Sequence, residues 1–436
     1  MTILLIYVAI FVGAFFAVKF ISSRLEARKD FTSLKTVTFG DESAVRPNRA
    51  ASIISIVAIF LIWGAFTGSK LTPIHAPGPF TGSGSFEIVV QDAEGNRDAS
   101  TVFWQVEDSK GSGGEIEGAT EGEGSALNDA INIIKYRSGQ LLWDKNDETN
   151  RKNGAQIVEI NGIPVQFDFN KRDENGTIID TRPRVDIENG SVSLTDKGAL
   201  LITPSQGWQM EPIWLPPPEK VVSRLGEIAS TGYQNFTLIE HLGWSLIRVV
   251  LGFFFGALVG IPLGYAMGLS DWFRGWFDPI VEFMRPVPPL ALIPLVIIWA
   301  GIGEVGKIIL LFLAALWIMT IAARAGVSGV NITKVHAAYS LGASKWQIMR
   351  YVIMPNSLPE IFTGARVAMG VCWGTVVAAE LVAAEKGAGM MIMVASKFQL
   401  TDIVIMGIIL IGIIGYGIDI LMRMAENWLV PWKGRS

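Results

Sequence analysis

Long runs of apolar residues constrain this chain more than any other feature of its sequence. Half of its 436 residues are hydrophobic, only 17% are charged, and the mean hydropathy is +0.39. A helix that crosses a membrane needs about 20 mostly apolar residues. The sequence therefore predicts an α-helical polytopic membrane protein. Its seven predicted spans are residues 3–21, 51–66, 242–269, 287–302, 305–322, 364–384 and 403–421.

The basic residues of the short loops predict how these spans are oriented, because loops rich in Lys and Arg stay in the cytoplasm. Fifteen basic residues lie in segments 22–50, 270–286 and 323–362 and after the last span. The alternate short loops hold only three, which are Lys307, Lys386 and Lys397. We therefore expect the N-terminus outside and the C-terminus in the cytoplasm.

Residues 68–213, between the second and third spans, have a different composition and are expected to lie outside the cytoplasm. They hold 23 acidic and 13 basic residues, a net charge of about −10. Residues 125–143 have one apolar helical face and predict a helix, and the Gly-rich segment 111–126 predicts a flexible acidic loop. We expect an independently folded β-rich or α+β domain. Strand-like patches lie at 86–92, 101–106, 155–160, 163–169, 184–189 and 199–204, with turns at Asn161-Gly162 and Asn175-Gly176.

Proline-rich stretches mark both edges of this insert and divide the chain into three parts. Residues 1–67 are expected to form two spans with a basic cytoplasmic loop, and residues 214–436 a second membrane region. Residues 219–230 have one apolar helical face and predict a helix along the outer membrane surface.

The polar segment 336–355 lies between two apolar runs and reads as helix, glycine, helix. The first helix is indicated by Ala337, Ala338 and Leu341. Gly342 is expected to end it, Ser344 to cap a second helix, and Pro355 to end that one. A loop defined this closely between two spans predicts a contact surface for another protein.

Glycines recur every four residues in the third predicted span, and small residues at this spacing leave a ridge on which another helix packs closely. These glycines are Gly252, Gly256, Gly260, Gly264 and Gly268. The sixth span repeats the pattern at Gly370, Gly374 and Ala378, and Pro262 is expected to kink the third. The ridges indicate either general helix packing or surfaces that slide when the protein changes conformation.

One motif is misleading. Residues 301–307, GIGEVGK, fit the phosphate-loop pattern, but residue 308 is Ile rather than the Ser or Thr that binds magnesium. No strand precedes the motif, so we expect a tight turn between two spans and no nucleotide site. The three His residues are far apart in the predicted topology, and Cys372 is the only cysteine, so we expect neither a metal site nor a disulfide framework.

Charged residues inside apolar spans are costly and therefore mark functional candidates. Arg248 lies in the third predicted span and Glu380 near the outer end of the sixth. Arg285 and Arg366, near inner ends, are expected to anchor at the membrane interface. Glu380 is expected either to pair inside the helical bundle or to face the path of a solute.

Residues 214–434 resemble the permease subunit of the nitrate, sulfonate and taurine group of binding-protein-dependent ABC importers. The segment 336–355 resembles the coupling loop of these permeases, which begins Glu-Ala-Ala and ends Leu-Pro. The matching positions are His336, Ala337, Ala338, Leu341, Gly342, Ala343 and Pro355. Here His336 replaces the usual Glu and Met354 the usual Leu. Further similar stretches are WLPPPEKV, MRPVPPLALIPLVIIWAGIGEVGKI and PEIFTGARVAMG, and AAELVAAEKGAG with PWKG is most similar to the taurine branch.

This resemblance implies a type I importer core in a bacterial inner membrane that takes up a small organosulfonate, most of all taurine. It implies a homodimer enclosing one path, two ATPase subunits docked on coupling loops within residues 326–362, and a soluble periplasmic binding protein. The chain itself is then not an enzyme and holds no cofactor, since ATP and magnesium are on the partner subunit. It contacts membrane lipid and no nucleic acid. Trp373, Thr375 and Glu380 are the candidates for lining or gating the path.

Other interpretations remain open. The solute could be another small anion, such as an alkanesulfonate or nitrate. A secondary transporter would typically show broken helices with ion ligands at the membrane midplane. A membrane sensor would use residues 68–213 as its ligand domain and would need a cytoplasmic output domain. Co-purification of an ATPase separates the importer from both. The first span and residues 68–213 lie outside the family pattern, and for the insert we favour a docking or gating role.

Overall fold

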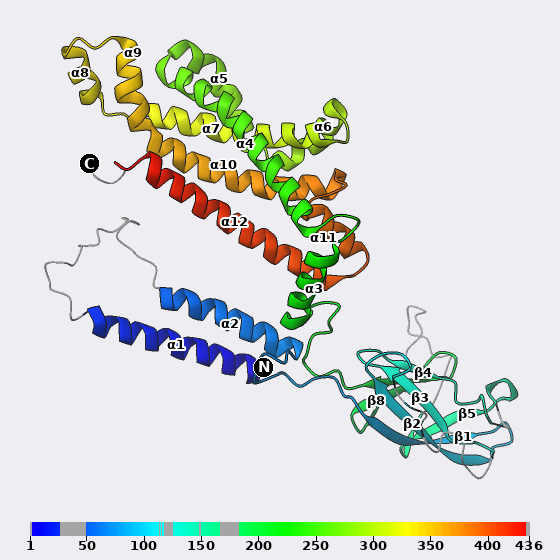
Figure 1. Ribbon diagram of the computed structural model, residues 1–436. Coiled ribbons are helices and arrows are strands. Elements are labelled where there is room, and N and C mark those ends of the chain that lie inside the picture. Colours follow the sequence, from blue (N-terminus) through cyan, green and yellow to red (C-terminus); the bar gives the residue numbers. More distant parts are fainter. Residues whose placement is uncertain are drawn as a thin grey trace, which may run out of the picture. The chain divides into compact units, whose positions relative to one another are not determined.

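The computed structural model describes residues 2–26, 49–112, 114, 116, 125–147, 150–165 and 183–432 (Figure 1). The chain divides into two compact units, Met1–Pro218 and Glu219–Ser436. Four sequence predictions fall wholly or mostly outside the described residues: the basic segment 22–50, the acidic loop 111–126, the strand at 163–169 and the turn at Asn175-Gly176.

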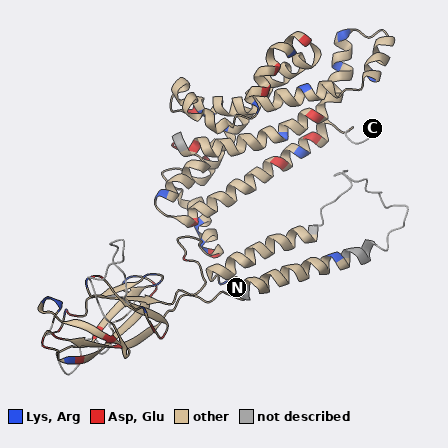
Figure 2. Ribbon diagram, turned by 180° about the vertical axis from the view of Figure 1, so that it is seen from behind, with Lys and Arg blue, Asp and Glu red and all other residues tan. Residues whose placement is uncertain are grey.

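The first unit begins with two apolar helices, α1 (Thr2–Glu26) and α2 (Arg49–Thr67). Charged residues are scarce along the described parts of both helices (Figure 2), and each helix is long and apolar enough to cross a membrane. The hydroxyl of Tyr7 in α1 donates to the carbonyl of Ile74, 2.8 Å away, just beyond α2. The two predicted spans at 3–21 and 51–66 are confirmed as helices.

The rest of the first unit consists of two sheets on one hydrophobic core. The five-stranded sheet has the order β3-β2-β1-β5-β6 and the four-stranded sheet the order β4-β9-β8-β7. Buried side chains of both sheets, among them Ile88, Trp104 and Ile202, form a single cluster. The strands are β1 (Ser83–Gln91), β2 (Arg97–Glu107), β3 (Asp129–Ile134), β4 (Gly139–Leu141), β5 (Gln156–Ile160), β6 (Ile163–Pro164), β7 (Val185–Ile187), β8 (Gly190–Leu194) and β9 (Leu200–Pro204).

Most predicted strands are confirmed, and the turn at Asn161-Gly162, with φ of 47° and 72°, connects β5 to β6 as expected for a two-residue hairpin. The predicted helix at 125–143 is wrong, because these residues form β3, a turn and β4. β3 pairs in parallel with β2 along its whole length. Tyr136, at φ 66°, then reverses the chain in a conformation that no helix contains. Pairing with β2 outweighs the helical spacing of the apolar residues.

The chain enters and leaves these sheets at one place. The N–H of Met210 donates to the carbonyl of Phe66 (2.8 Å), at the end of α2. The N–H of Trp208 donates to the carbonyl of Pro77 (2.7 Å). The segments that lead into and out of the sheets are therefore joined to each other by backbone hydrogen bonds.

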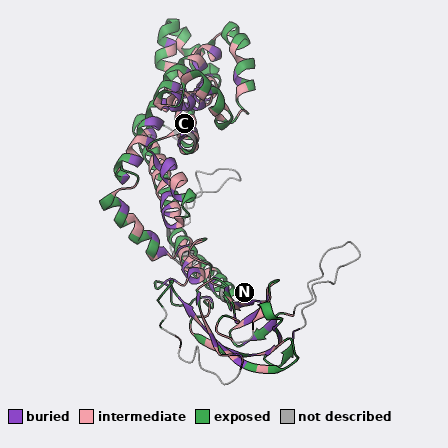
Figure 3. Cartoon of the chain, turned by 90° about the vertical axis from the view of Figure 1, so that its right-hand side faces the viewer, coloured by how far each residue is buried: buried purple, intermediate pink, exposed green. Residues whose placement is uncertain are grey.

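The second unit is helical, and long stretches of its helices are exposed or half-buried (Figure 3). The elements of this unit are α3 (Pro218–Thr231), α4 (Leu238–Leu269), α5 (Asp271–Met284), the 3₁₀ turn η4 (Pro289–Leu292), α6 (Ile293–Ala300), α7 (Glu304–Ser328), α8 (Ile332–Ser340), α9 (Lys345–Ile348), the π-helical turn η5 (Met349–Ile353), α10 (Met354–Ala383), α11 (Ala388–Lys397) and α12 (Thr401–Leu429). The amphipathic helix predicted at 219–230 is confirmed as α3.

Six helices among the described residues are long and apolar enough to span a membrane. The number rises to seven if the bent pair Asp271–Met284 and Pro289–Ala300 is counted as one further span. The predicted span at 287–302 is the exception, because it is not a continuous helix. Pro289–Ala300 is bent by 95° from Asp271–Met284. The sequence Pro286-Val287-Pro288-Pro289 explains the break, since proline lacks the N–H that would continue a helix.

The glycines of α4 face α7 at close range. A Cβ added at Gly252 would lie 2.3 Å from the Cβ of Leu311, and one at Gly264 would lie 2.4 Å from the carbonyl oxygen of Thr320. Gly256 and Gly260 meet α7 in the same way. The four residues therefore let two helical backbones approach more closely than any side chain would permit.

The second glycine pattern behaves differently. Apart from the backbone of α10 itself, no described atom lies within 4 Å of the position where Gly370 or Gly374 would carry a Cβ. Among the described residues these glycines of α10 are not a packing ridge. Pro262 lies inside α4, which continues through it as one helix.

Candidate functional site

The segment 336–355 forms two short helices joined at Gly342. α8 ends at Ser340, and Gly342 has φ +83°, a left-handed conformation that favours glycine. The hydroxyl of Ser344 accepts the N–H of Gln347, and the Gln347 side chain accepts the N–H of Ser344 (2.7 Å). This reciprocal pair starts α9 as a capping box.

Pro355 does not end the second helix, so that part of the prediction is wrong. Residues from Lys345 to Leu381 form one long apolar helical stretch through α9, η5 and α10. Pro355 lies in the first turn of α10, directly after the π-helical turn. A wider turn at this point accommodates a residue that cannot donate a backbone hydrogen bond.

Large apolar side chains of this segment are exposed. Leu341 is 88% exposed, and Tyr339, Trp346 and Tyr351 are each exposed by more than 60%. His336 and Ala337 are also exposed, whereas Ala338 and Ala343 pack partly against the core beneath. Exposed apolar surface of this extent on a short, well-capped loop is typical of a protein contact.

A second arrangement, which we call the charge cluster, consists of Arg248, Glu304, Lys307 and Glu380. Nε and Nη2 of Arg248, in α4, donate to the two oxygens of Glu304 in α7 at 2.5 and 2.7 Å. Nη1 donates to Glu380 of α10 at 2.5 Å and to the carbonyl of Lys386 at 2.9 Å. Nζ of Lys307 donates to Glu304 at 3.1 Å. One buried guanidinium thus joins three helices and the loop that follows α10.

The same region holds the first turn of α11. Its free backbone N–H groups are accepted by side chains of α4 and α10, at distances near 3 Å. The acceptors are His241 Nδ1 for Gly387 (3.1 Å), Ser245 Oγ for Ala388 (3.0 Å) and Glu380 Oε2 for Gly389 (2.9 Å). A helix start that would otherwise leave buried donors unsatisfied is therefore fixed by tertiary contacts.

Two details show how closely this turn is fitted. Nε2 of His241 lies 3.0 Å from the carbonyl of Tyr233, which can only accept, so its partners assign the proton to Nε2 and leave Nδ1 as the acceptor for Gly387. Gly387 has φ +143°, and a Cβ there would lie 2.4 Å from the carboxyl carbon of Glu380. Only glycine fits this position.

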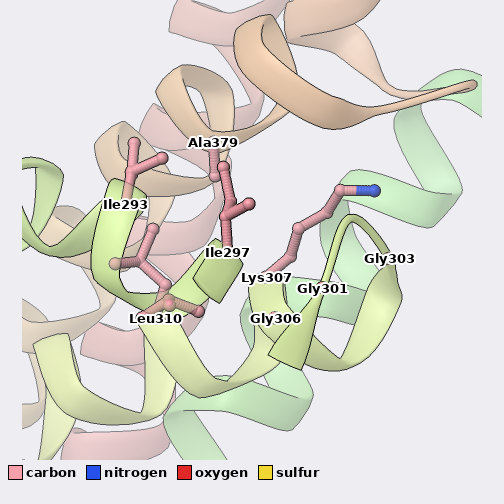
Figure 4. A pocket seen from close by; sticks show the side chains of 9 residues that line it. Ile293, Ile297, Gly301, Gly303, Gly306, Lys307, Leu310 and Ala379 are labelled. Carbon is pink, nitrogen blue, oxygen red and sulfur yellow. The ribbon is translucent and has the colours of Figure 1, made fainter. Parts of the chain in front are cut away.

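A hollow that we call the lysine hollow opens beside the charge cluster, between the α6–α7 turn and α11. Its charged lining residues are Glu304, Lys307, Glu380, Glu385, Lys386 and Lys397, and Met390, Met393 and Val394 are among its apolar ones. A small apolar pocket lies nearby. Figure 4 shows Ile293, Ile297 and Leu310 gathered in that pocket, with the Lys307 side chain directed away from them.

The GIGEVGK sequence is a turn between helices. Gly301, at φ +73°, follows α6, and Gly303 precedes the first residue of α7. The two glycines reverse the chain and place Glu304 at the start of α7, where it meets Arg248. The motif that mimics a phosphate loop thus positions a member of the charge cluster.

The sequence candidates for the solute path lie in different surroundings. Trp373 is buried among core residues and its indole N–H donates to the carbonyl of Ile411 (3.0 Å). Thr375 is buried, and Glu380 is fully enclosed in the charge cluster. The structure brings Glu380 together with Arg248, the other charge singled out inside a span.

Sequence reasoning missed His241, Ser245, Glu304 and Lys307 as partners in this region. The available signal was weak: Glu304 and Lys307 belong to the phosphate-loop-like sequence, and His241 begins an apolar run. Arg366, expected at the inner interface, lies 3.7 Å from Glu426 of α12.

Comparison with known proteins identifies the helical unit. Residues 238–430 match the family described as binding-protein-dependent transport system inner membrane component. The chain is 47% identical over 226 residues to the taurine transport system permease protein TauC of Escherichia coli (strain K12), covering 52% of this chain and 82% of that protein. It is 36% identical over 229 residues to the putative aliphatic sulfonates transport permease protein SsuC of the same organism, covering 52% of this chain and 85% of that protein.

Among solved structures, the methionine ABC transporter MetNI in an inward-facing conformation aligns with a TM-score of 0.39 and 20% identity, covering 44% of this chain and 94% of the matched chain. The family match begins at residue 238, so the first unit lies outside it. ABC permeases are not enzymes, and separate subunits hydrolyse ATP. The chain therefore belongs to the family of binding-protein-dependent transport system inner membrane components, as a multi-pass permease of an ABC importer, a family that works with ATPase and substrate-binding proteins.

Proposed function

We propose that this chain forms the translocation path for taurine in an importer built from two copies of the chain and two ATPase subunits. The observation that carries the transport role is the exposed apolar surface of the α8–α9 segment, on a helical unit that matches the permease family. The choice of taurine rests on the 47% identity to a taurine permease, against 36% to an aliphatic sulfonate permease. An importer for an alkanesulfonate or nitrate is the second candidate.

In this mechanism the ATPase subunits dock on residues 336–355, and their closure on ATP moves α8 and α9. Because α9, η5 and α10 are one continuous helical stretch, displacement of the docked segment is transmitted directly along α10. Glu380 and its partners lie near the far end of that helix. The segment faces the cytoplasm, with the N-terminus outside, as the basic loops predict.

Reconstitution tests this proposal. The chain is co-purified with its ATPase and placed in liposomes with the binding protein and labelled taurine, ethanesulfonate or nitrate. We expect ATP-dependent uptake of taurine above that of the other two, and none when an ion gradient replaces ATP. Uptake driven by a gradient alone would identify a secondary transporter, and preferred uptake of nitrate or ethanesulfonate would replace taurine as the substrate.

A matched variant tests the docking surface. Leu341→Asp places a charge on the most exposed apolar side chain of the segment and is expected to abolish co-purification of the ATPase. Ile163→Asp, an exposed apolar site on β6 outside the predicted spans, leaves residues 336–355 unaltered and serves as the control for a new surface charge. Equal retention of the ATPase by the Leu341 variant and the unaltered chain would contradict docking at this segment.

A further inference from the structure

The charges of the lysine hollow are not all compensated. Glu304 and Glu380 are paired with Arg248 and Lys307. The side chains of Glu385 and Lys397 have no hydrogen bond or ion pair with any other described residue, and both are exposed. The hollow therefore presents one acidic and one basic group that are free to bind a ligand.

Lys386 adds a second cation with an unusual partner. Its Nζ lies 4.0 Å from the centre of the Trp244 ring and 5.5 Å from that of Phe236. The aromatic faces hold the ammonium by cation–π attraction, and the Glu240 carboxylate of α4 is close enough to interact with it electrostatically. Since the Lys386 carbonyl is fixed by Arg248, the charge cluster sets the position of this residue and of Glu385 beside it.

The remaining wall of the hollow is apolar. Met390, Met393 and Val394 line it from α11, and Leu381 lines it from α10. Low-dielectric walls strengthen the attraction between a bound ion and a nearby charge, and methionine adapts its shape to small ligands. The hollow thus combines two cations, one anion and a flexible apolar surface.

We propose that the lysine hollow is a binding site for a zwitterionic sulfonate, with Lys397 and Lys386 facing the sulfonate and Glu385 facing the ammonium group. This proposal rests on the proposed function and adds residues that recognise the solute. The three lysines of the hollow, Lys307, Lys386 and Lys397, are also the only basic residues that sequence analysis placed in the short outer loops. The site then lies where a binding protein releases its solute.

Charge restoration on a cysteine background tests the proposal in the assembled importer. Lys397→Cys is expected to lower the initial rate of taurine uptake at low concentration about two- to fivefold, the effect of losing one exposed ion pair. Methanethiosulfonate ethylammonium, which rebuilds a positive charge on the cysteine, is expected to restore uptake. Methanethiosulfonate ethylsulfonate, which adds a negative charge, is expected to lower it further.

Glu385→Cys is expected to respond in the opposite way to Lys397→Cys. The anionic reagent is expected to restore its rate of taurine uptake, and the cationic reagent is not. Lys220→Cys, an exposed lysine on α3, is the matched control and is expected to be insensitive to both reagents. The unaltered complex, treated in parallel, reports any effect on other cysteines, including Cys372, which is buried.

The outcomes separate the two proposals. If the unaltered complex takes up taurine but the two variants respond alike to both reagents, the site is wrong and the proposed function stands. If the unaltered complex takes up only a sulfonate without an ammonium group, taurine is wrong as the substrate, and with it the role of Glu385.

Discussion

Asp129 is a buried acid without a compensating partner. It is 6% exposed, and its Oδ2 has no hydrogen-bond partner among the described residues. Burial, together with the nearby charges of Asp147 and Asp144, raises the pKa of Asp129 to about 7. The folded chain therefore holds this proton at pH values where the unfolded chain, with an ordinary pKa near 3.8, has released it.

Because the pKa of Asp129 is higher in the folded state than in the unfolded state, the stability of the sheet unit is predicted to fall as pH rises. Between about pH 4 and 7 the folded state binds more protons than the unfolded state, so the free energy of unfolding of the sheet unit decreases and stays lower above pH 7. Asp129→Asn removes the ionisable group and is expected to stabilise the unit at pH 8 by about 1–2 kcal/mol. Hydrogen exchange of peptides from β2 and β3 at pH 5 and 8 measures this, with the exposed Asp186→Asn in β7 as control. An undiminished pH dependence in the Asp129→Asn variant would contradict the assignment, since Asp147, whose pKa is also raised, contributes a separate part of it.

Gly342 is the residue on which the coupling segment depends. A β-branched side chain at φ +83° is strained, at a cost of about 1–2 kcal/mol. Gly342→Val is expected to leave the protein inserted in the membrane but to abolish solute-stimulated ATP hydrolysis. The strained turn changes the orientation of α8 relative to α9, and with it the surface on which the ATPase docks. Gly412→Val, in a helix with open space around it, is the control. Normal stimulated hydrolysis in the Gly342 variant would remove the segment from the coupling mechanism.

At this scale the sequence identified individual residues but not their partners. Arg248 and Glu380 are conspicuous as charges inside apolar runs, yet they are 132 positions apart, and nothing local indicates that they meet. Ser344 and Gly342 were predictable because a cap and a left-handed turn depend only on neighbours in the chain. Pro355 was misassigned because a π-helical turn accommodates it.

Among the elements, buried Arg248 joins α4 to α10 through Glu380 and to α7 through Glu304. Removing one member of such a pair leaves an uncompensated charge and costs about 3–5 kcal/mol. We expect Arg248→Met and Glu380→Gln each to lower the thermal stability of the purified protein, and Arg248→Met combined with Glu380→Met to lower it by less than the sum. The exposed pair of Arg423 and Asp419 on α12, treated the same way, should change stability by less than about 1 kcal/mol.

A thermal denaturation series by size-exclusion chromatography measures these effects. Strict additivity in the double variant would show that the two charges do not stabilise each other. Full stability of Glu380→Gln with loss of taurine uptake would instead place the carboxylate on the solute path.

The glycine ridge of α4 gives a prediction with an internal control. Gly264→Leu puts a side chain where the backbone of α7 lies, so we expect the helical unit to misfold. A Cβ at Gly370 on α10 would have no described atom within 4 Å beyond its own helix backbone, so Gly370→Leu is expected to fold normally. Protease resistance of the expressed membrane protein distinguishes the two. If the Gly370 variant folds but the importer fails to assemble, the open face of α10 is covered by another subunit.

Helix positions followed well from hydropathy, since six of the seven predicted spans are continuous helices. The two failures have a common cause. Residues 125–143 and 287–302 have the apolar content of helices, but strand pairing with β2 decides the first and three closely spaced prolines decide the second. The spacing of apolar residues carries no information on strand pairing or on helix breaking by proline, so it could not predict either outcome.

For the whole molecule, the sheet domain gives the sharpest test. Residues 68–213 contain one hydrophobic core and no cysteine, so expressed alone they are expected to fold without disulfides. Their net charge of about −10 is unfavourable for the sulfonate group of taurine, and we expect a docking role for the domain, so calorimetry with taurine is expected to show no heat of binding. Deletion in the full chain is expected to weaken engagement of the binding protein. Clear binding of taurine by the isolated domain would overturn the docking role, and unaltered uptake after the deletion would make the domain dispensable.

The paired segments at Phe66–Pro77 and Trp208–Met210 have a consequence for how such a chain can arise and be altered. Because backbone hydrogen bonds join the segment that leads into the sheets to the segment that leads out of them, the chain leaves and returns at neighbouring points. A domain inserted there does not separate the segments that flank it. A gene could gain or lose the segment that encodes this domain in a single recombination event without altering the sequence of the helices on either side. The same geometry makes the junction a natural place to graft a reporter domain onto the protein.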